Sequence, residues 1–244
     1  MKMKNKKTEQ EAKKLESKRL LAEAKRKKRM SSSDLQREEI ETSEEKQSFL
    51  IVCEGQNTEK SYFDQFKIPN AEITTIGTGH NTVSLVQYTK KIVDSKKEKG
   101  STFDQIWCVF DKDDFDSFDQ AIQLAIRYGF KVAYSNQAFE YWLILHFNDH
   151  QGGAMPRTDY SKRINGEISK YGAFYDADGS KMVDENFFTY LQSINPTSKK
   201  SRQQEAISRA KKIFENKIGM KPSLSESITT VYQLIMEIVD LKED

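Results

Sequence analysis

The 244-residue chain has only two cysteines, three histidines and four prolines, and no long apolar run. Too few Cys and His residues stand at ligand spacing for a zinc site. A membrane-spanning helix needs about 20 consecutive apolar residues, so no membrane span is expected. The first residues are charged and lack the apolar segment of a secretory signal. These absences, with both cysteines inside expected core strands, favour a soluble protein of the reducing cytoplasm.

Charge is unevenly distributed, although the net charge is only +2. Residues 1–30 carry 13 Lys and Arg against four Glu. The basic block at residues 25–29 can contact phosphates, but charge runs at chain ends are more often solvated tails, and we favour that interpretation. Residues 1–47 are therefore expected to form a charged, helical or disordered extension.

From residue 48 onward, short apolar runs alternate with amphipathic segments. This alternation predicts an α/β fold, Rossmann-like, with a largely parallel four-stranded sheet and helices on both faces. After residue 150 the pattern becomes helical, which divides the chain into an extension (1–47), an α/β core (48–150) and a helical C-terminal region packed on the core (151–244). The expected strands are 48–53, 71–76, 105–110 and 131–135. The expected helices are 58–66, 82–97, 115–128, 139–147, 159–170, 184–193, 201–216 and 225–241, and Thr58 is expected to cap the first of them.

Acidic residues follow two of the expected strands directly. Glu54 and then Gly55 follow the first strand, and Asp111 and Asp113 follow the third. Ligands of open α/β sheets bind outside the carboxyl ends of the strands, so these acids are expected to face one crevice if the two strands are neighbours. Clustered carboxylates repel each other, and Mg²⁺ is the usual ion that compensates them.

Two further acids extend this set. Glu59 lies in the first turn of the expected helix, where a carboxylate also suits the helix dipole. Asp114 is expected either to face away or to cap the next helix. The simpler interpretation of the run 111–114 is a polar strand-to-helix turn, but its pairing with Glu54-Gly55 favours a catalytic site. Hard cations held by such a set can activate water and stabilise the leaving oxygen of a phosphodiester.

Other candidates depend on position alone. Asn136 and Glu140 follow the fourth strand and can add polar groups to the crevice, although Glu140 fits a surface-facing helix position equally well. Asn81 follows the second strand and can contact phosphate, but helix capping is the favoured interpretation. Lys112 or Lys60 can stabilise the developing negative charge of a phosphoryl group.

Three motifs together resemble one known family. The pattern Glu-Gly-x-x-Thr-Glu after one apolar strand and Asp-x-Asp-Asp after another resembles the Toprim fold. The segments IVCEGQNTEKSYF (51–63), WCVFDKDDF (107–115) and AYSNQAFEYWLILHF (133–147) resemble the RloB-like family, also known as the AbiLii toxin type of abortive infection. The resemblance covers roughly residues 48–240.

The resemblance implies a function for these acids. It implies that Glu54 is a metal ligand and acid/base, that Asp111 and Asp113, with Asp114 beside them, bind metal, and that Glu59 is a second acid. It further implies a Mg²⁺-dependent nuclease, with Mn²⁺ as the alternative metal, that acts on DNA or RNA in phage defence beside an AAA-family ATPase.

Two alternatives remain. The fold can serve as a non-catalytic scaffold or sensor that docks the ATPase. Asp111 can also act as a phosphoryl-accepting nucleophile of the haloacid-dehalogenase type, but in that family the Asp-x-Asp motif follows the first strand. Here an acid-bearing strand precedes it, which disfavours this alternative.

Overall fold

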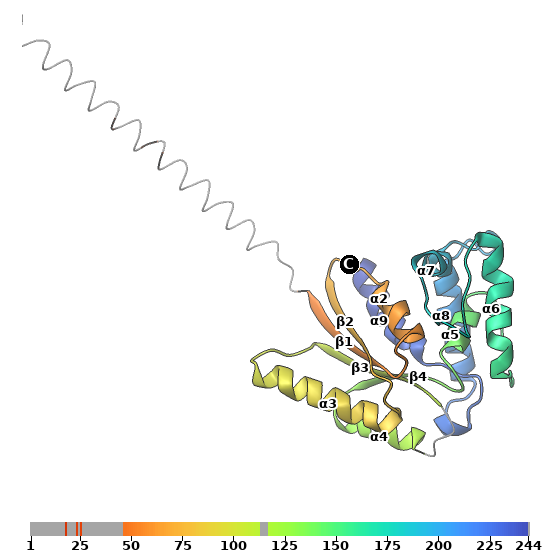
Figure 1. The fold of residues 1–244 in the computed structure, drawn as a ribbon, viewed down its shortest axis with the longest axis horizontal. Helices are drawn as coiled ribbons and strands as arrows, with labels where there is room; N and C mark the ends of the chain where they lie inside the picture. Colours follow the sequence, from red (N-terminus) through yellow and green to blue (C-terminus); the bar gives the residue numbers. More distant parts are fainter. Residues whose placement is uncertain (1–17, 19–22, 24, 26–45, 113–116, 244) are drawn as a thin grey trace, which may run out of the picture. The chain divides into compact units, whose positions relative to one another are not determined.

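A parallel sheet in the order β2-β1-β3-β4 forms the centre of the fold (Figure 1). Its strands are β1 (Gln47–Cys53), β2 (Ala71–Gly77), β3 (Gln105–Asp111) and β4 (Lys131–Ser135). All three neighbouring pairs are parallel, so every strand ends at the same edge. The predicted four-stranded parallel α/β fold is therefore confirmed, and β1 and β3 are neighbours.

This structure is a computed structural model that describes residues 18, 23, 25, 46–112 and 117–243. The chain divides into the units Met1–Glu45 and Lys46–Asp244. In the first unit, the three described residues are helical and exposed. Within the described part of the chain, no helix combines the length and apolar character needed to cross a membrane.

Helices cover both faces of the sheet because strand side chains alternate between the faces. Leu50 and Val52 of β1 pack in the cluster that contains α3 (Thr82–Glu98) and α4 (Phe118–Arg127). Phe49 and Ile51 point the other way, into a larger cluster. That cluster contains residues of α2 (Thr58–Asp64), α5 (Glu140–Leu145) and α9 (Val231–Glu243).

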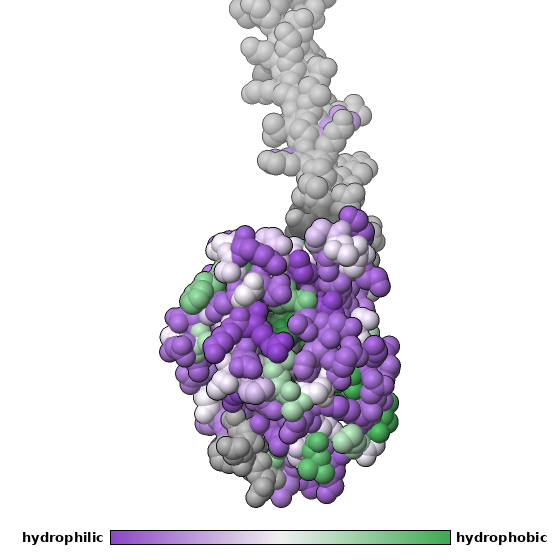
Figure 2. Space-filling view, turned by 90° about the vertical axis from the view of Figure 1, so that its right-hand side faces the viewer, coloured by the Kyte–Doolittle hydropathy of each residue, from purple (hydrophilic) through white to green (hydrophobic). Residues whose placement is uncertain are grey.

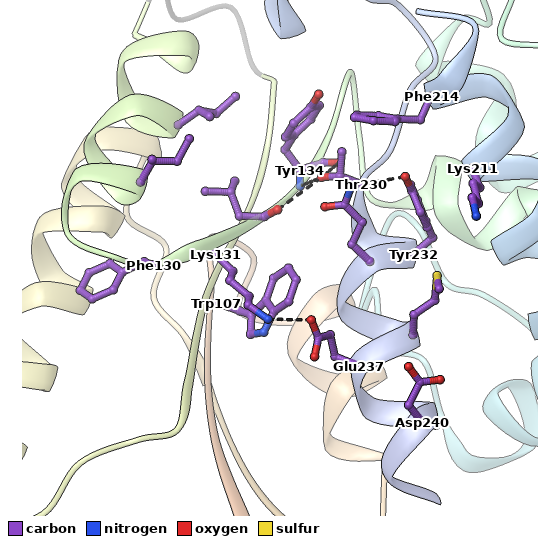
Figure 3. Close-up of a pocket in the computed structure, with 15 residues that line it drawn as sticks. Trp107, Phe130, Lys131, Tyr134, Lys211, Phe214, Thr230, Tyr232, Glu237 and Asp240 are labelled. Atoms are coloured by element: carbon purple, nitrogen blue, oxygen red, sulfur yellow. Dashed lines mark hydrogen bonds and ion pairs between the residues drawn. The ribbon is translucent and has the colours of Figure 1, made fainter. Parts of the chain in front are cut away.

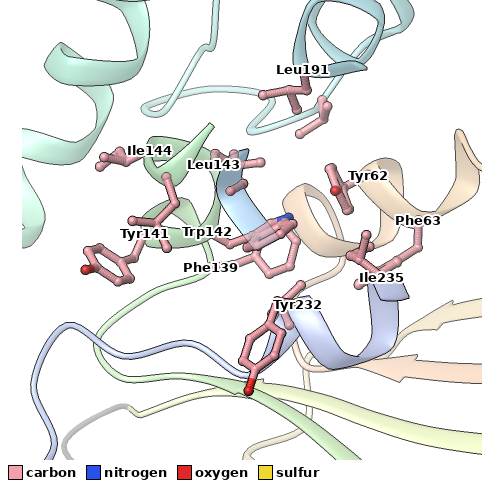
Figure 4. Packing of buried hydrophobic residues seen from close by; sticks show 14 of the residues in the cluster. Tyr62, Phe63, Phe139, Tyr141, Trp142, Leu143, Ile144, Leu191, Tyr232 and Ile235 are labelled. Carbon is pink, nitrogen blue, oxygen red and sulfur yellow. The ribbon is translucent and has the colours of Figure 1, made fainter. Parts of the chain in front are cut away.

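The C-terminal region extends this larger cluster. It contains the helices α6 (Tyr160–Ile168), α7 (Glu185–Gln192) and α8 (Arg202–Glu215) and the short 3-10 turns η1 (Arg157–Asp159), η2 (Ser169–Tyr171) and η3 (Pro222–Leu224). Aromatic rings join it to the core, since Tyr62 of α2 packs edge-on against Phe188 of α7 at 5.5 Å. Tyr62 also packs edge-on against Phe139 at 5.4 Å, beside Trp142 (Figure 4). Such edge-to-face contacts stabilise beyond simple burial.

The two cysteines are free and buried. Cys53 pairs in register with Val109, and Val52 pairs with Cys108, so the two thiols point to opposite faces of the sheet. Burial is the main cause that raises the pKa of both, that of Cys108 to about 12. Both thiols are therefore protonated at neutral pH and serve as small apolar groups.

Two local predictions were wrong. The helix expected over 225–241 begins only at Val231, and Thr229 instead forms an antiparallel bridge with Ser135 at the outer edge of β4. The β-branched run at this point suits an extended conformation. Thr58 was expected to cap α2, but Asn57 occupies the cap position and Thr58 is the first helical residue.

Candidate active site

A pocket of about 220 Å³ opens beyond the carboxyl ends of β1 and β3. Four of the predicted acids, Glu54, Glu59, Asp111 and Glu140, line it together. They come from the end of β1, the first turn of α2, the end of β3 and the first turn of α5. We call this site the acid pocket. Its remaining lining residues are Gly55, Gln56, Asn57, Thr58, Arg157 and Lys181.

Backbone hydrogen bonds fix the position of Glu54. Its N–H donates to the carbonyl of Val109 on β3 at 2.9 Å, which continues the β1–β3 pairing by one residue. Its carbonyl accepts from the N–H of Gly79 at 2.8 Å. The neighbouring strands β2 and β3 therefore hold Glu54 from both sides.

Two glycines allow the chain to turn tightly here. The Glu59 carboxylate lies over Gly55 and accepts from its N–H at 3.2 Å. A Cβ atom on Gly55 would lie 1.8 Å from Glu59 Oε2, and one on Gly77 would lie 2.7 Å from the backbone Cα of Gln56. Only glycine permits such close approaches. The Glu-Gly motif therefore places the carboxylate of Glu59 against the backbone that carries Glu54.

Asp111 and Glu140 are held by different partners. One oxygen of Asp111 accepts from the backbone N–H of Phe139 at 3.1 Å. Glu140 accepts from the hydroxyl of Tyr175 at 2.6 Å. Asp111 is thus tied to the start of α5, and Tyr175 holds Glu140 toward the pocket rather than on a solvent-facing helix surface.

The acids act electrostatically on each other. Glu59 is only 6% exposed, and burial followed by the charge of Glu140 raises its pKa to about 7, against hydrogen bonds and the charge of Arg157. Burial, with the charges of Glu59 and Glu140, also raises the pKa of Asp111 well above its ordinary value. Desolvation and like charges both disfavour ionised carboxylates. Added positive charge would therefore be favourable in this pocket.

An irregular segment of the C-terminal region, residues 173–183, closes one side of the pocket, and we call it the cover segment. Within it, the hydroxyl of Tyr175 lies 3.0 Å from Thr58 Oγ1, and Thr58 donates to the carbonyl of Lys181 at 2.8 Å. Asn165 of α6 holds Tyr175 by two hydrogen bonds to its backbone. The N–H of Val183 donates to Ser61 on α2. The cover segment is therefore hydrogen-bonded directly to the helix that carries Glu59.

Two cationic side chains accompany the acids. Arg157 and Lys181 are exposed and line the pocket from the C-terminal region. The charge of Arg157 lowers the pKa values of Glu59 and Asp111, but burial outweighs it. A guanidinium group and an ammonium group at the opening of an acidic pocket suit phosphate oxygens.

The chemistry of the donor set fits a divalent cation. Carboxylate oxygens are the preferred ligands of Mg²⁺, and buried carboxylates with raised pKa values are stabilised by a cation. Glu54, Glu59 and Asp111 are the candidates to hold it. As placed, however, no three His, Cys, Asp or Glu side chains within 46–112 and 117–243 form a group that can hold a metal ion.

The other predicted residues lie elsewhere or are not described. Asp113 and Asp114 lie outside the described residues. Lys60 forms an ion pair with Asp64 on α2, and the side chain of Asn136 donates to the carbonyl of Pro222 at 3.0 Å. Neither of them, nor Lys112 or Asn81, is among the residues that line the acid pocket. Asn81 does occupy the cap position of α3, without a capping hydrogen bond from its side chain.

Sequence reasoning missed four residues at the pocket. Arg157, Tyr175 and Lys181 all come from the C-terminal region, which the sequence pattern identifies only as loops and helices. Thr58 was noted only as a cap. A single sequence contains no signal for the three distant residues, because long-range packing alone brings them to the acids.

A larger cavity, of about 730 Å³, lies at the outer edge of β4 (Figure 3). We call it the edge groove. Its walls come from β3, β4, α4, α8 and α9 and include Trp107, Tyr134 and Phe214. Lys131 forms an ion pair with Glu237 at 2.6 Å and lies over the ring of Trp107. None of the predicted site residues lines the edge groove.

Comparison with known families gives one finding. A family model described as RloB-like protein matches residues 49–238, well over half of the chain. The match begins in β1, ends in α9 and includes every described residue of the acid pocket. Comparison with curated proteins gives no match.

Proposed function

The chain belongs to the RloB-like protein family, and we propose that it is a metal-dependent nuclease whose active site is the acid pocket. One observation carries the proposal. Carboxylates from β1, α2, β3 and α5 meet in one pocket, and two of them, Glu59 and Asp111, have pKa values raised by burial and by neighbouring acids. Such shifts are typical of functional sites.

The residues of the chain have distinct roles in this proposal. Glu54, Glu59 and Asp111 are the residues that would hold Mg²⁺ or Mn²⁺, and the bound ion would supply Lewis-acid stabilisation of charge on a phosphodiester. Arg157 and Lys181 bind and orient non-bridging phosphate oxygens. Tyr175 orients Glu140 through its hydrogen bond.

The biological setting is part of the same proposal. Members of the family that the sequence resembles are associated with phage defence and with an AAA-family ATPase. We propose that this chain is the nuclease effector of such a pair. Support comes from family membership and from the chemistry of the pocket.

A cleavage assay tests the proposal. The purified full-length chain, with and without MgCl₂ or MnCl₂, is incubated with single- and double-stranded DNA and RNA, and the products are separated on gels. We expect metal-dependent cleavage that Asp111→Asn and Glu54→Gln each reduce by at least about a hundredfold, the scale of losing a main electrostatic group. Asp94→Asn, on the exposed surface of α3, is the matched control and keeps full activity.

Equal cleavage by wild type and both acid variants would refute the nuclease proposal. Circular dichroism of each variant shows whether loss of activity reflects the chemistry or the fold. An absence of cleavage under all conditions, also with the partner ATPase added, would equally count against it.

A non-catalytic scaffold is the second candidate, and one observation favours it. Three acids already accept internal hydrogen bonds, Glu59 from Gly55, Asp111 from Phe139 and Glu140 from Tyr175. In that case the acids stabilise the contact between the sheet and the cover segment. Acid variants that retain phage defence, while deletion of residues 151–244 abolishes it, would support this candidate.

A further inference from the structure

Three aromatic rings form a stack beyond the C-terminal end of α5. Phe147 stacks on Tyr190 of α7 at 5.5 Å with 19° between the ring planes. Tyr190 in turn contacts Tyr171 of η2, with ring centres 3.9 Å apart. Phe147 and Tyr190 are partly or fully buried, whereas Tyr171 is 52% exposed. Tyr171 is therefore the outermost ring of an ordered stack and has a solvent-accessible surface.

Cationic groups accompany this stack. The guanidinium of Arg202 lies 4.7 Å from the ring centre of Tyr190 and 5.6 Å from that of Phe147, and its side chain is buried. Lys170 lies 5.5 Å from the ring centre of Tyr171. Lys170 is itself exposed and also pairs with Glu167 at 3.1 Å. The stack therefore has a buried arginine over its two inner rings and an exposed lysine over its outer ring.

The surroundings favour a polar partner over an apolar one. The side of the molecule that carries α6 in Figure 1 is largely hydrophilic in the space-filling view (Figure 2). An exposed aromatic ring with cations on a hydrophilic surface is the combination by which proteins bind single-stranded nucleic acid, because bases stack on the ring and phosphates contact the cations. Bases inside a duplex are stacked on each other and do not offer their faces to such a ring.

We propose that the substrate is a single-stranded nucleic acid, and that one of its bases stacks on Tyr171 while Lys170 contacts the adjacent phosphate. The inference rests on the proposed nuclease function for the identity of the partner. The small volume of the acid pocket agrees with it, since about 220 Å³ lies below the roughly 300–1,000 Å³ of ordinary ligand pockets and suits one phosphate with its sugar.

Helix α6 connects the two places. It begins at Tyr160, which donates to Gln137 at 3.0 Å in the loop that also positions Asp111 and Glu140. It ends at Ile168, just before Tyr171. The eight α-helical steps from Tyr160 to Ile168 at about 1.5 Å and the three 3-10 steps to Tyr171 at about 2.0 Å span about 18 Å. This corresponds to roughly five stacked nucleotides at about 3.4 Å each. A single strand of that length can reach from Tyr171 to the acid pocket.

The test measures binding separately from cleavage. Fluorescence anisotropy is recorded for labelled single-stranded DNA, single-stranded RNA and the duplex of the same sequence, in buffer with EDTA. The variants are Tyr171→Ala, Tyr171→Phe and Phe174→Ala. Phe174 is the matched control, since it lies three residues away and is 64% exposed, and no ring contact is found for it among the described residues.

We expect Tyr171→Ala to weaken single-strand binding by roughly tenfold, the scale of one lost base stack. Tyr171→Phe and Phe174→Ala keep wild-type affinity, and the duplex binds weakly to all variants. The comparison of DNA with RNA shows which sugar the site accepts. Equal affinities of Tyr171→Ala and Phe174→Ala, tighter binding of the duplex, or no binding to any nucleic acid would overturn the inference.

The outcomes also separate the two proposals. Single-strand binding that depends on Tyr171, without cleavage in the presence of metal, would refute the nuclease proposal and leave this inference standing. Cleavage that depends on Asp111 but not on Tyr171, with duplex and single strand cut alike, would refute only this inference.

Discussion

The acid pocket and the edge groove contain the same kind of side chain in opposite electrostatic states. Glu237 in the groove accepts hydrogen bonds from Gln105 and Lys131, and these lower its pKa. Glu59 in the pocket is buried near other acids, and its pKa is raised to about 7. The groove is the larger cavity, with about 730 Å³ against about 220 Å³. The size of a cavity therefore says nothing about the electrostatic state of the carboxylates that line it.

The difference comes from what surrounds each carboxylate. In the groove, a lysine and an amide lie beside a half-exposed glutamate, and solvent screens the remaining charge. In the pocket, burial removes solvent from several acids, and Arg157 compensates them only in part. Buried carboxylates that repel each other are typical of a site that binds a charged ligand. Carboxylates that are paired with a cation are typical of a surface with a structural role.

The largest expected effect comes from the backbone that supports the pocket. In Gly77→Ala, the new Cβ would lie 2.7 Å from the Cα of Gln56 and 2.8 Å from the carbonyl oxygen of Gly55, and backbone atoms cannot rotate away. We expect a loss of about 1–3 kcal/mol in the free energy of unfolding, measured by urea denaturation. Gly153→Ala is the matched control, because its Cβ would meet nothing within 4 Å. Equal stability of the two variants would contradict the described packing.

A second prediction concerns the pH dependence of the pocket. The native pKa of Glu59, about 7, lies above its ordinary value of 4.5, so the folded protein binds this proton more tightly than the unfolded chain. The contribution of Glu59 to the stability of the wild type therefore falls as pH rises from 4.5 to 7. Glu59→Gln keeps an acceptor for the Gly55 N–H and removes this loss. We expect it to be more stable than wild type at pH 8, by up to about 3 kcal/mol, and nearly equal at pH 4.5.

Thermal denaturation at the two pH values, with and without Mg²⁺, measures this effect. Mg²⁺ that binds the native pocket stabilises the wild type by mass action and reduces its difference from Glu59→Gln. A variant that is less stable than wild type at pH 8 would show that the negative charge of Glu59 is well compensated, and the contrast with the groove would disappear.

The smallest expected effect is in the edge groove, with the opposite sign. The lowered pKa of Glu237 means that its ion pair contributes stability above pH 4.5, and that this contribution is lost as pH falls through the lowered value. Because both side chains are more than 40% exposed, Glu237→Gln costs at most about 1 kcal/mol at pH 7. Denaturation at low and high salt measures it. A loss of several kcal/mol would place this pair among the buried, functional charges.

The sequence predicted the sheet well because strand signals are local. The runs at 51–53 and 107–110 are apolar on both faces, as buried parallel strands require, and each ends at an acid. Glu54 and Asp111 meet only because β1 and β3 are neighbours in the sheet. No local sequence pattern predicts which strands are neighbours.

The rest of the site depends on contacts between distant parts of the chain. Arg157 begins the short turn η1, and Tyr175 and Lys181 lie in the irregular cover segment. None of the three stands in a periodic pattern, so local sequence does not place them near the acids. The same holds for Thr229, whose bridge to the edge of β4 replaced an expected helical turn. At such positions, tertiary contacts rather than local propensity determine the conformation of the chain.

The hydrogen bonds of Thr58 have a consequence for the order in which the site assembles. Thr58 is separated by 117 residues from Tyr175 and by 123 from Lys181, so these contacts close very long loops. During synthesis the N-terminal part of a chain emerges first. A nascent chain that has completed β4 already contains Glu54, Glu59 and Asp111 but lacks the cover segment. The buried, high-pKa pocket is therefore a property that the chain acquires late, once residue 183 has been added.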